Sequence, residues 1–160
     1  MSEAPVRPSV VPLLWYDRPR LAIDWLQKAF GFDAQMVVSG DDESVIHSEL
    51  TFGNGAIYVV GPATTGHGGT TPSQTGGRNT QSVHLNLTGG LDAHCQAARA
   101  AGAKIEREPA DQPYGDRVYT CVDLEGHIWS FSQPAKALSP EEMARATGRK
   151  IETKEEASHG

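Results

Sequence analysis

Apolar and polar positions alternate along the chain first with the period of a strand and then with that of a helix. The apolar run over residues 10–16 is rich in β-forming side chains and predicts a buried strand. The segment 19–30 predicts a helix, with Asp17 as its N-cap and Gly31 at its end. Its apolar residues recur at helical spacing: Leu21, Trp25, Leu26 and Phe30. Alternating patterns between turn signals then predict three strands, over 34–39, 45–52 and 56–60.

The same order of elements returns in the second half of the chain. The pattern predicts a strand over 82–88, a helix over 91–101 closed by Gly102, and strands over 103–107, 116–122 and 127–132. Sliding one half onto the other places Leu13 on His84, Gly31 on Gly102, Gly55 on Gly126, and Ile57 on Ile128. A chance alignment of glycine-terminated helices would not repeat the strand, helix and three strands in order. An internal repeat is therefore the better interpretation.

The segments outside the repeat have a different composition. After Gly61 the sequence turns to Gly, Thr, Ser, Pro and Gln, and too few apolar side chains remain to offset the entropy of ordering. We expect one domain over 8–136, with module one at 8–62, a mobile linker at 63–81 and module two at 82–136. In the remainder, 137–160, the motif that begins at Ser139 predicts a short helix with a capping box, followed by a disordered charged tail.

Composition narrows the classes of function. A length of 160 residues with 38% hydrophobic residues suits one globular domain. The net charge of −6 argues against nucleic acid as a partner. No apolar run approaches the roughly 20 residues that cross a bilayer, and the N-terminal stretch predicts no signal peptide. Cys95 and Cys121 fit reduced thiols in the cytoplasm better than a disulfide framework.

Two parts of the sequence resemble one known group of proteins. The segment 12–17, running into 22–26 and 29–32, resembles the opening of glyoxalase and bleomycin-resistance proteins. The segment 114–117, followed by 122–131, resembles the closing strands of the same vicinal oxygen chelate superfamily (glyoxalase/bleomycin resistance protein/dioxygenase). The resemblance implies an α+β fold of two tandem βαβββ modules. Their curved mixed sheets would carry helices on the convex side and a ligand cup on the concave side, in a homodimer.

The resemblance also provides a test for a metal. In metal-dependent members the ligands come from the first and last strands of each module, usually as His, Gln or Glu. The matching positions here hold Val11 or Val10, Val59 with Tyr58 beside it, His84, and Ser130. A single imidazole among such residues does not supply the three or so protein ligands of a catalytic divalent ion. We therefore expect neither a metal nor another cofactor.

One alternative keeps a metal in view. His47 and Glu49 alternate on one face of a predicted inner strand, and these two donors would have to join His84. The other interpretation is a solvated strand face, because polar residues at period two are ordinary on a half-exposed sheet.

Strand alternation predicts which side chains face the cup. With His84 facing inward, its neighbours Ser82 and Asn86, and the repeat-related Ile57 and Ile128, do the same, whereas Trp129 and Phe131 face the helix layer. We expect the polar face of 116–122, which also carries Cys121, to look into the cup, and the loop at Tyr114 to reach over its rim. The predicted ligand-binding residues are Leu13, Trp15, Val59, His84, Asn86, Tyr114, Arg117, Tyr119 and Ser130. The rival interpretation is that such residues only fill the sheet.

The leading hypothesis is a metal-independent small-molecule binding protein that resembles the bleomycin-resistance branch and sequesters an antibiotic or another aromatic metabolite. The alternative is a lyase, isomerase or dioxygenase, either with a relocated metal or with acid–base work by His84 while Tyr119 or Arg117 stabilises an oxyanion. A nucleophilic Cys121 with His84 as its base is a further alternative, although a small buried thiol is the commoner outcome. A third interpretation gives the C-terminal tail a role in docking a partner.

Overall fold

The computed structural model describes residues 7–154, and the predicted elements are present in the predicted order. Helix α1 begins and ends where the sequence predicts, and its C-cap Gly31 has the expected left-handed conformation. The elements are β1 (Leu13–Trp15), α1 (Pro19–Phe30), β2 (Asp33–Ser39), β3 (Val45–Phe52), β4 (Gly55–Val60), the 3₁₀ turn η1 (Pro72–Thr75), β5 (Val83–Asn86), α2 (Leu91–Ala100), β6 (Lys104–Asp111), β7 (Asp116–Val122), β8 (Ile128–Pro134) and α3 (Pro140–Thr147).

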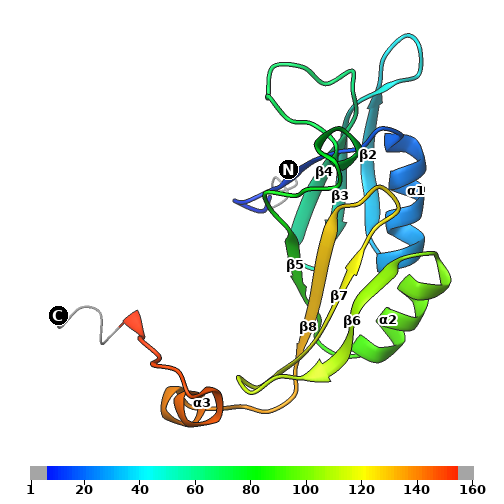
Figure 1. The fold of residues 1–160 in the computed structure, drawn as a ribbon. Coiled ribbons are helices and arrows are strands. Elements are labelled where there is room, and N and C mark those ends of the chain that lie inside the picture. The colour runs from blue at the N-terminus through cyan, green and yellow to red at the C-terminus, as the bar shows by residue number, and fades with distance from the viewer. Residues whose placement is uncertain (1–6, 155–160) are drawn as a thin grey trace, which may run out of the picture.

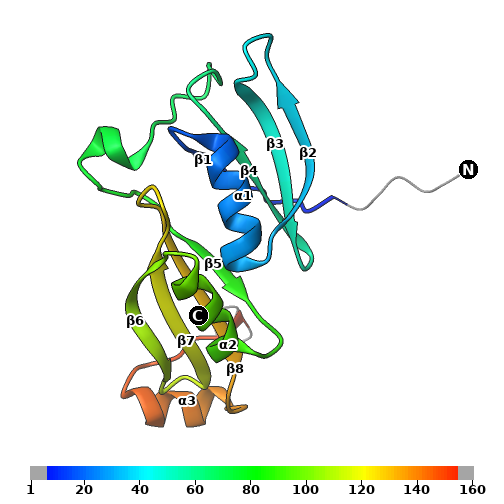
Figure 2. The same cartoon turned by 90° about the vertical axis from the view of Figure 1, so that its right-hand side faces the viewer.

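The strands form two four-stranded mixed sheets with the same topology. Their orders are β1-β4-β3-β2 and β5-β8-β7-β6, and in each sheet the first strand pairs with the last in parallel. Helices α1 and α2 lie on the same side of the two sheets (Figures 1 and 2). The expected α+β fold of two βαβββ modules is confirmed. We call the side of the sheets away from α1 and α2 the open face.

One hydrophobic core joins the two modules on the helix side. The ring of Phe30, at the end of α1, lies 5.1 Å from that of Trp129 and 4.9 Å from that of Phe131, both on β8. The indole nitrogen of Trp25 in α1 donates to the carbonyl of Ala101, 2.7 Å away, just after α2. Because apolar side chains from both modules fill one core, the modules support each other. Trp129 and Phe131 face the helix layer, as predicted.

A buried carboxylate fixes the junction between the modules. Asp123, in the turn between β7 and β8, accepts hydrogen bonds from the Tyr16 hydroxyl at 2.6 Å and from the Trp129 indole at 2.9 Å. Its second oxygen accepts from the backbone amides of Glu125 and His127. Burial, followed by the neighbouring Asp123 charge, raises the pKa of Tyr16 well above its usual value. The phenol therefore stays protonated and remains a donor.

The register differs by one residue from the predicted superposition of the two halves. Leu13 lies opposite Tyr58, and His84 lies opposite Ser130, so the repeat places Tyr58 rather than Val59 on Ser130. Module two thus has one more residue than module one between its first and last strands, and the last hairpin is one place where the modules differ in length. In module one Phe52 pairs with Gly55, whereas in module two the loop between Val122 and its partner Ile128 is longer. A shift of one residue turns each side chain to the other face of a strand.

Part of the predicted linker, residues 63–81, packs against module one. Thr71 and Pro72 are buried around η1, and Thr64 Oγ1 donates to the carbonyl of Ile46. The Ser73 hydroxyl donates to the Asp17 carboxylate at 2.6 Å. Asp17, the residue expected to cap α1, therefore binds the linker instead of the helix. The N-cap is instead Arg18, and no side chain bonds to the helix there.

The C-terminal helix has the predicted capping box, in which Ser139 and Glu142 exchange side-chain and backbone hydrogen bonds. The helix ends at Gly148 in the left-handed conformation. The tail expected to follow is described only to residue 154, and residues 155–160 lie outside the described part of the chain.

Candidate functional site

A row of polar side chains crosses the open face of module two. His84 on β5 lies 2.6 Å from the hydroxyl of Ser130 through Nδ1 and 2.9 Å from the hydroxyl of Ser132 through Nε2. The Ser132 hydroxyl donates to the amide oxygen of Asn86 at 3.0 Å. We call these four residues the serine–histidine row. It follows from strand alternation, because His84 and Asn86 lie opposite Ser130 and Ser132 in the parallel β5–β8 pair.

The hydrogen bonds of the row have one consistent direction. Asn86 takes the Ser132 proton on its amide oxygen, so Ser132 accepts from Nε2–H of His84. Nδ1 is then an acceptor, and the Ser130 hydroxyl donates to it. This assignment of tautomer rests on the network of partners. It leaves the oxygen lone pairs of Ser130 available on the open face as hydrogen-bond acceptors.

A groove runs along the seam between the two modules, bordered by the first strand of each, and His84 lines it. It consists of two adjoining hollows with about 440 and 560 Å³ of open space, and Pro12, Val83 and His84 line both. The first hollow is lined mainly by apolar residues: Val10, Phe32, Phe52, Gly55, Ala56, Ile57 and Leu85. The second adds hydrogen-bonding groups and two aliphatic residues: Gln81, Ser82, His127, Leu14 and Ile128. An apolar groove with a few convergent polar groups is typical of small-molecule sites.

The open face of module one carries a second polar pair. His47 Nε2 lies 3.2 Å from Glu49 Oε1 on β3, and the His47 ring meets the Tyr58 ring edge-on at 4.6 Å. Leu13 and Trp15 also belong to this face, because Leu14 and Tyr16 pack into the core on the other side. Within residues 7–154, no three His, Cys, Asp or Glu side chains come close enough together to hold a metal ion.

Val59 does not face the groove, so its predicted orientation is wrong. Its side chain is fully buried in the helix-side core, and its backbone bonds the Ser48 hydroxyl through both N–H and carbonyl. Ile57 is buried on the same side, although it also touches the apolar end of the groove. The neighbour Tyr58 takes the place expected for Val59.

Arg117, Tyr119 and Cys121 also face the helix layer, contrary to the prediction. The Tyr119 hydroxyl lies 2.5 Å from His94 Nδ1 on α2, and its ring stacks on Phe131. Cys121 lies opposite Trp129, and burial raises the pKa of its thiol to about 12. Directly opposed residues of antiparallel strands share a face. Tyr119 and Cys121 lie opposite Phe131 and Trp129, so they must share the helix side with them. A thiol with such a raised pKa is a poor nucleophile, and it is remote from His84 on the other face of the sheet.

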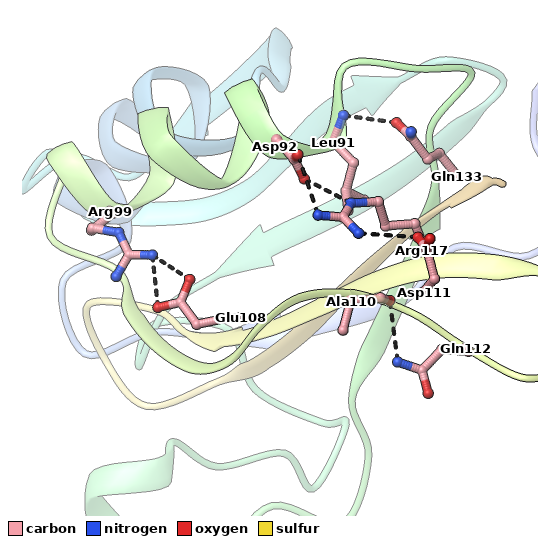
Figure 3. A network of polar contacts seen from close by, with 9 residues as sticks. All are labelled: Leu91, Asp92, Arg99, Glu108, Ala110, Asp111, Gln112, Arg117 and Gln133. Carbon is pink, nitrogen blue, oxygen red and sulfur yellow. Dashed lines mark hydrogen bonds and ion pairs between the residues drawn. The ribbon is translucent and has the colours of Figure 1, made fainter.

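Arg117 belongs to a surface network that holds α2 against the second sheet (Figure 3). Its guanidinium donates to Asp92 at 2.9 Å and to Asp111 at 3.0 Å, and both carboxylates raise the pKa of Arg117 through these bonds. The Gln133 side chain accepts from the backbone amide of Leu91 at the start of α2. These contacts use the hydrogen-bonding groups that an oxyanion would require.

Tyr114 lies in the hairpin between β6 and β7 and is 42% exposed. Tyr114 is not among the described residues that line the groove. The groove instead gains residues that sequence reasoning missed, above all Pro12, Phe32 and Phe52. Strand pairing was the signal that would have found them, because Phe52 ends β3 where it pairs with Gly55 at the seam.

Most of the chain matches the sequence model of one known protein family. Residues 10–131 match the glyoxalase/bleomycin resistance protein/dioxygenase superfamily. The chain belongs to this superfamily. A protein of Mycobacterium bovis, the uncharacterized protein Mb0911c, is 34% identical over 144 residues, which cover 88% of this chain and 93% of the relative.

Solved structures of other proteins share the fold. TioX from Micromonospora sp. ML1 is 31% identical with a TM-score of 0.63, and the match covers 78% of this chain and 96% of TioX. TnmS3, an antibiotic binding protein from Streptomyces sp. CB03234, is 17% identical with a TM-score of 0.56, covering 84% of this chain and 98% of TnmS3. At that identity TnmS3 shows the fold alone.

The residues at the superfamily's usual metal positions do not fit a divalent ion. Val10 and Val11 carry no donor atom, and Ser130 offers a neutral hydroxyl where a carboxylate is expected. Both ring nitrogens of His84 already have hydroxyl partners. Tyr58 adds a phenol, which leaves one imidazole as the only strong ligand of the set.

In the part of the chain that the structure describes, no helix is long and apolar enough to cross a membrane.

Proposed function

We propose that this protein binds an apolar, aromatic small molecule in the seam groove without a metal ion, and so sequesters an antibiotic or a similar metabolite. The observation that carries the proposal is the serine–histidine row beside an apolar groove. The row offers oriented hydrogen-bond partners, and the groove offers apolar surface. Apolar burial supplies most of the affinity of such a site, and the polar groups fix the orientation of the ligand.

Two further points support the proposal. The donor set at the usual metal positions is too poor for Lewis-acid chemistry by a bound divalent ion. The fold is shared with TnmS3, an antibiotic binding protein, so the same arrangement of modules is compatible with antibiotic binding.

The test is a thermal-shift screen of aromatic antibiotics in the presence of a chelator, followed by calorimetry on each compound that stabilises the protein. His84→Ala should weaken binding about tenfold or more, because it removes the centre of the row and leaves hydroxyl groups without partners. His67→Ala is the matched control, since His67 lies in the linker with its ring 6.0 Å from that of Trp15 and does not line the groove.

Two results would refute the proposal. One is equal affinity in the wild type and the His84→Ala variant. The other is turnover of a bound compound that depends on an added metal ion, which would establish the enzyme alternative.

A further inference from the structure

A row of side chains crosses the open face of the first sheet, and one of them is a carboxylate. Met36 on β2 pairs with Glu49 on β3, and Leu13 on β1 pairs with Tyr58 on β4. The register of the β3–β4 pair, extended by one residue, places Glu49 opposite Tyr58. Directly opposed residues of neighbouring strands share a face of the sheet. Four residues therefore follow one another across the sheet, and we call them the glutamate row: Leu13, Tyr58, Glu49 and Met36.

The surroundings of Glu49 on this face are apolar and aromatic. Met36 lies opposite it and is 45% exposed, and Val38, two residues farther along the same strand, is 41% exposed and lies opposite His47. The His47 ring meets the Tyr58 ring edge-on at 4.6 Å. Adjoining exposed apolar side chains are typical of binding surfaces. Glu49 thus places one negative charge within a surface that otherwise suits an apolar ligand.

The Glu49 carboxylate has no cationic partner from its own chain. Its side chain is only 22% exposed, and its one hydrogen bond among residues 7–154 joins Oε1 to Nε2 of His47 at 3.2 Å. No lysine or arginine of the described chain forms an ion pair with it. As a neutral imidazole, His47 donates Nε2–H and leaves the negative charge uncompensated. A carboxylate largely withdrawn from water is stabilised by a positive group beside it, and Oε2 is available to accept from one.

The glutamate row begins at the seam groove. The backbone amide of Tyr58 donates to the carbonyl of Pro12 at 2.9 Å, and Pro12 lines both hollows. Ala56 lies two residues before Tyr58 on the same face and lines the first hollow. Neighbouring strands are about 4.8 Å apart, so Glu49 on β3 lies about 10 Å from β1 at the border of the groove. A drug-sized molecule in the groove can therefore extend to Glu49.

The second sheet carries the opposite charge at the equivalent place. His84, Ser130 and Thr120 follow one another across β5, β8 and β7. Thr120 occupies the place that Glu49 has in module one, and it pairs with Arg107 on β6. A positive group is therefore attracted to the open face of module one and repelled from that of module two. The repeat thus gives the two open faces opposite preferences for a charged ligand.

We propose that Glu49 binds the protonated amine of the ligand, so that the protein selects aromatic compounds that carry a basic group. The inference rests on the proposed function in one respect, because the aromatic body of the ligand lies in the seam groove. The ammonium group donates to Oε2 of Glu49 beside the Tyr58 ring, whose π-system also attracts a cation. The carbon chain between the amine and the aromatic body lies along Leu13.

The first test compares two probes that differ in charge alone. Naphthylethylamine is a cation at neutral pH, and naphthylethanol has the same ring and chain with a neutral hydroxyl. Calorimetry on the full chain should give the amine a dissociation constant about tenfold lower than that of the alcohol, because a charge-assisted hydrogen bond contributes about this factor. Glu49→Gln should bring the ratio of the two constants to about one. This variant keeps an oxygen that accepts from His47, and circular dichroism checks that it folds.

Asp41→Asn is the matched control for the loss of one negative charge. Asp41 is exposed in the turn after β2 of the same module, outside the glutamate row. The preference for the amine should therefore stay at its wild-type value in this variant. A preference that falls equally in Asp41→Asn and Glu49→Gln would assign the effect to the net charge of the protein and overturn the proposal.

His84→Ala separates this inference from the proposed function. It should weaken both probes by about the same factor and leave their ratio unchanged, because His84 lies across the seam from Glu49. If it weakens neither probe while Glu49→Gln still abolishes the preference, the groove proposal fails and the amine site stands. If it weakens both probes but the amine has no advantage, or keeps its advantage in Glu49→Gln, the amine site is refuted and the groove stands. An amine that does not bind at millimolar concentration refutes it as well.

Discussion

His94 lies in the core between the modules with both ring nitrogens occupied. Nε2 lies 2.8 Å from the carbonyl of Phe30, which can only accept, so Nδ1 must accept from the Tyr119 hydroxyl. Burial lowers the pKa of His94, and the bond to Phe30 opposes this only in part. If Nδ1 were also protonated, its hydrogen would point at the hydrogen of the Tyr119 hydroxyl, and that hydrogen bond would be lost. The folded protein therefore favours the neutral imidazole.

This predicts that the protein loses stability in mild acid. Below the ordinary histidine pKa of 6.5 the unfolded chain binds a proton at His94 that the folded chain refuses, so the free energy of unfolding falls as the pH falls. The loss levels off once the pH is below the lowered pKa of the folded state. Urea unfolding at a series of pH values measures it. His94→Gln keeps a donor and an acceptor without a titrating proton, so a slope as steep in this variant would exclude His94 as the cause.

Single residues were predictable where local chemistry decides. Gly31 ends α1, Ser139 caps α3, and both cysteines are buried free thiols. Asp17 was not predictable in this way. Its carboxylate bonds to Ser73, 56 residues away, because the linker returns to the start of α1. A tertiary partner thus replaced the local cap.

Among elements, strand order and approximate bounds followed from the pattern, but strand faces did not all follow. Counting along a strand predicts which residues share a face. It placed His84, Asn86 and Ser130 together, although Ser132, the fourth member of the serine–histidine row, was not predicted. Counting across a hairpin needs the length of the turn. The modules differ by one residue in the length between their first and last strands, which displaced the repeat and put Val59 on the wrong side. For Tyr119, polarity was taken as a sign of the cup, although a phenol with a buried partner belongs in a core.

The orientation of β7 predicts the behaviour of Arg117. Its partners lie on α2 and β6, so Arg117→Ala should lower the melting temperature slightly by releasing the start of α2. The affinity for any compound found in the ligand screen should not change. Calorimetry and thermal unfolding of the same variant check both statements. A large loss of affinity would return Arg117 to the binding site.

For the whole molecule, the sequence indicated two modules but not how tightly they are joined. The junction depends on Tyr16 and Asp123, which are 107 residues apart, and on a linker that was expected to be mobile. Contacts across such a separation leave no local pattern. Asp123 sits in a turn motif where a carboxylate is ordinary, so its burial and its four hydrogen bonds had no sequence signal.

The junction predicts unequal effects for two similar substitutions. Tyr16→Phe removes a buried donor from a buried carboxylate and should lower the free energy of unfolding by about 1–3 kcal/mol. Tyr58→Phe, on the half-exposed open face, should change it by less than about 0.5 kcal/mol. Denaturant titration compares the two. Equal effects would mean that the Tyr16–Asp123 hydrogen bond contributes little to holding the modules together.

The direction of the serine–histidine row has a consequence for selectivity. While Asn86 presents its amide oxygen to Ser132, it orients Ser132, then the imidazole, and finally Ser130. A compound that presents an amine or hydroxyl proton to Ser130 fits this orientation, whereas one that presents a carbonyl requires the whole relay to invert. Discrimination between two such chemotypes is thus decided at the far end of the relay, and an aliphatic residue in place of Asn86 would make the protein indifferent between them.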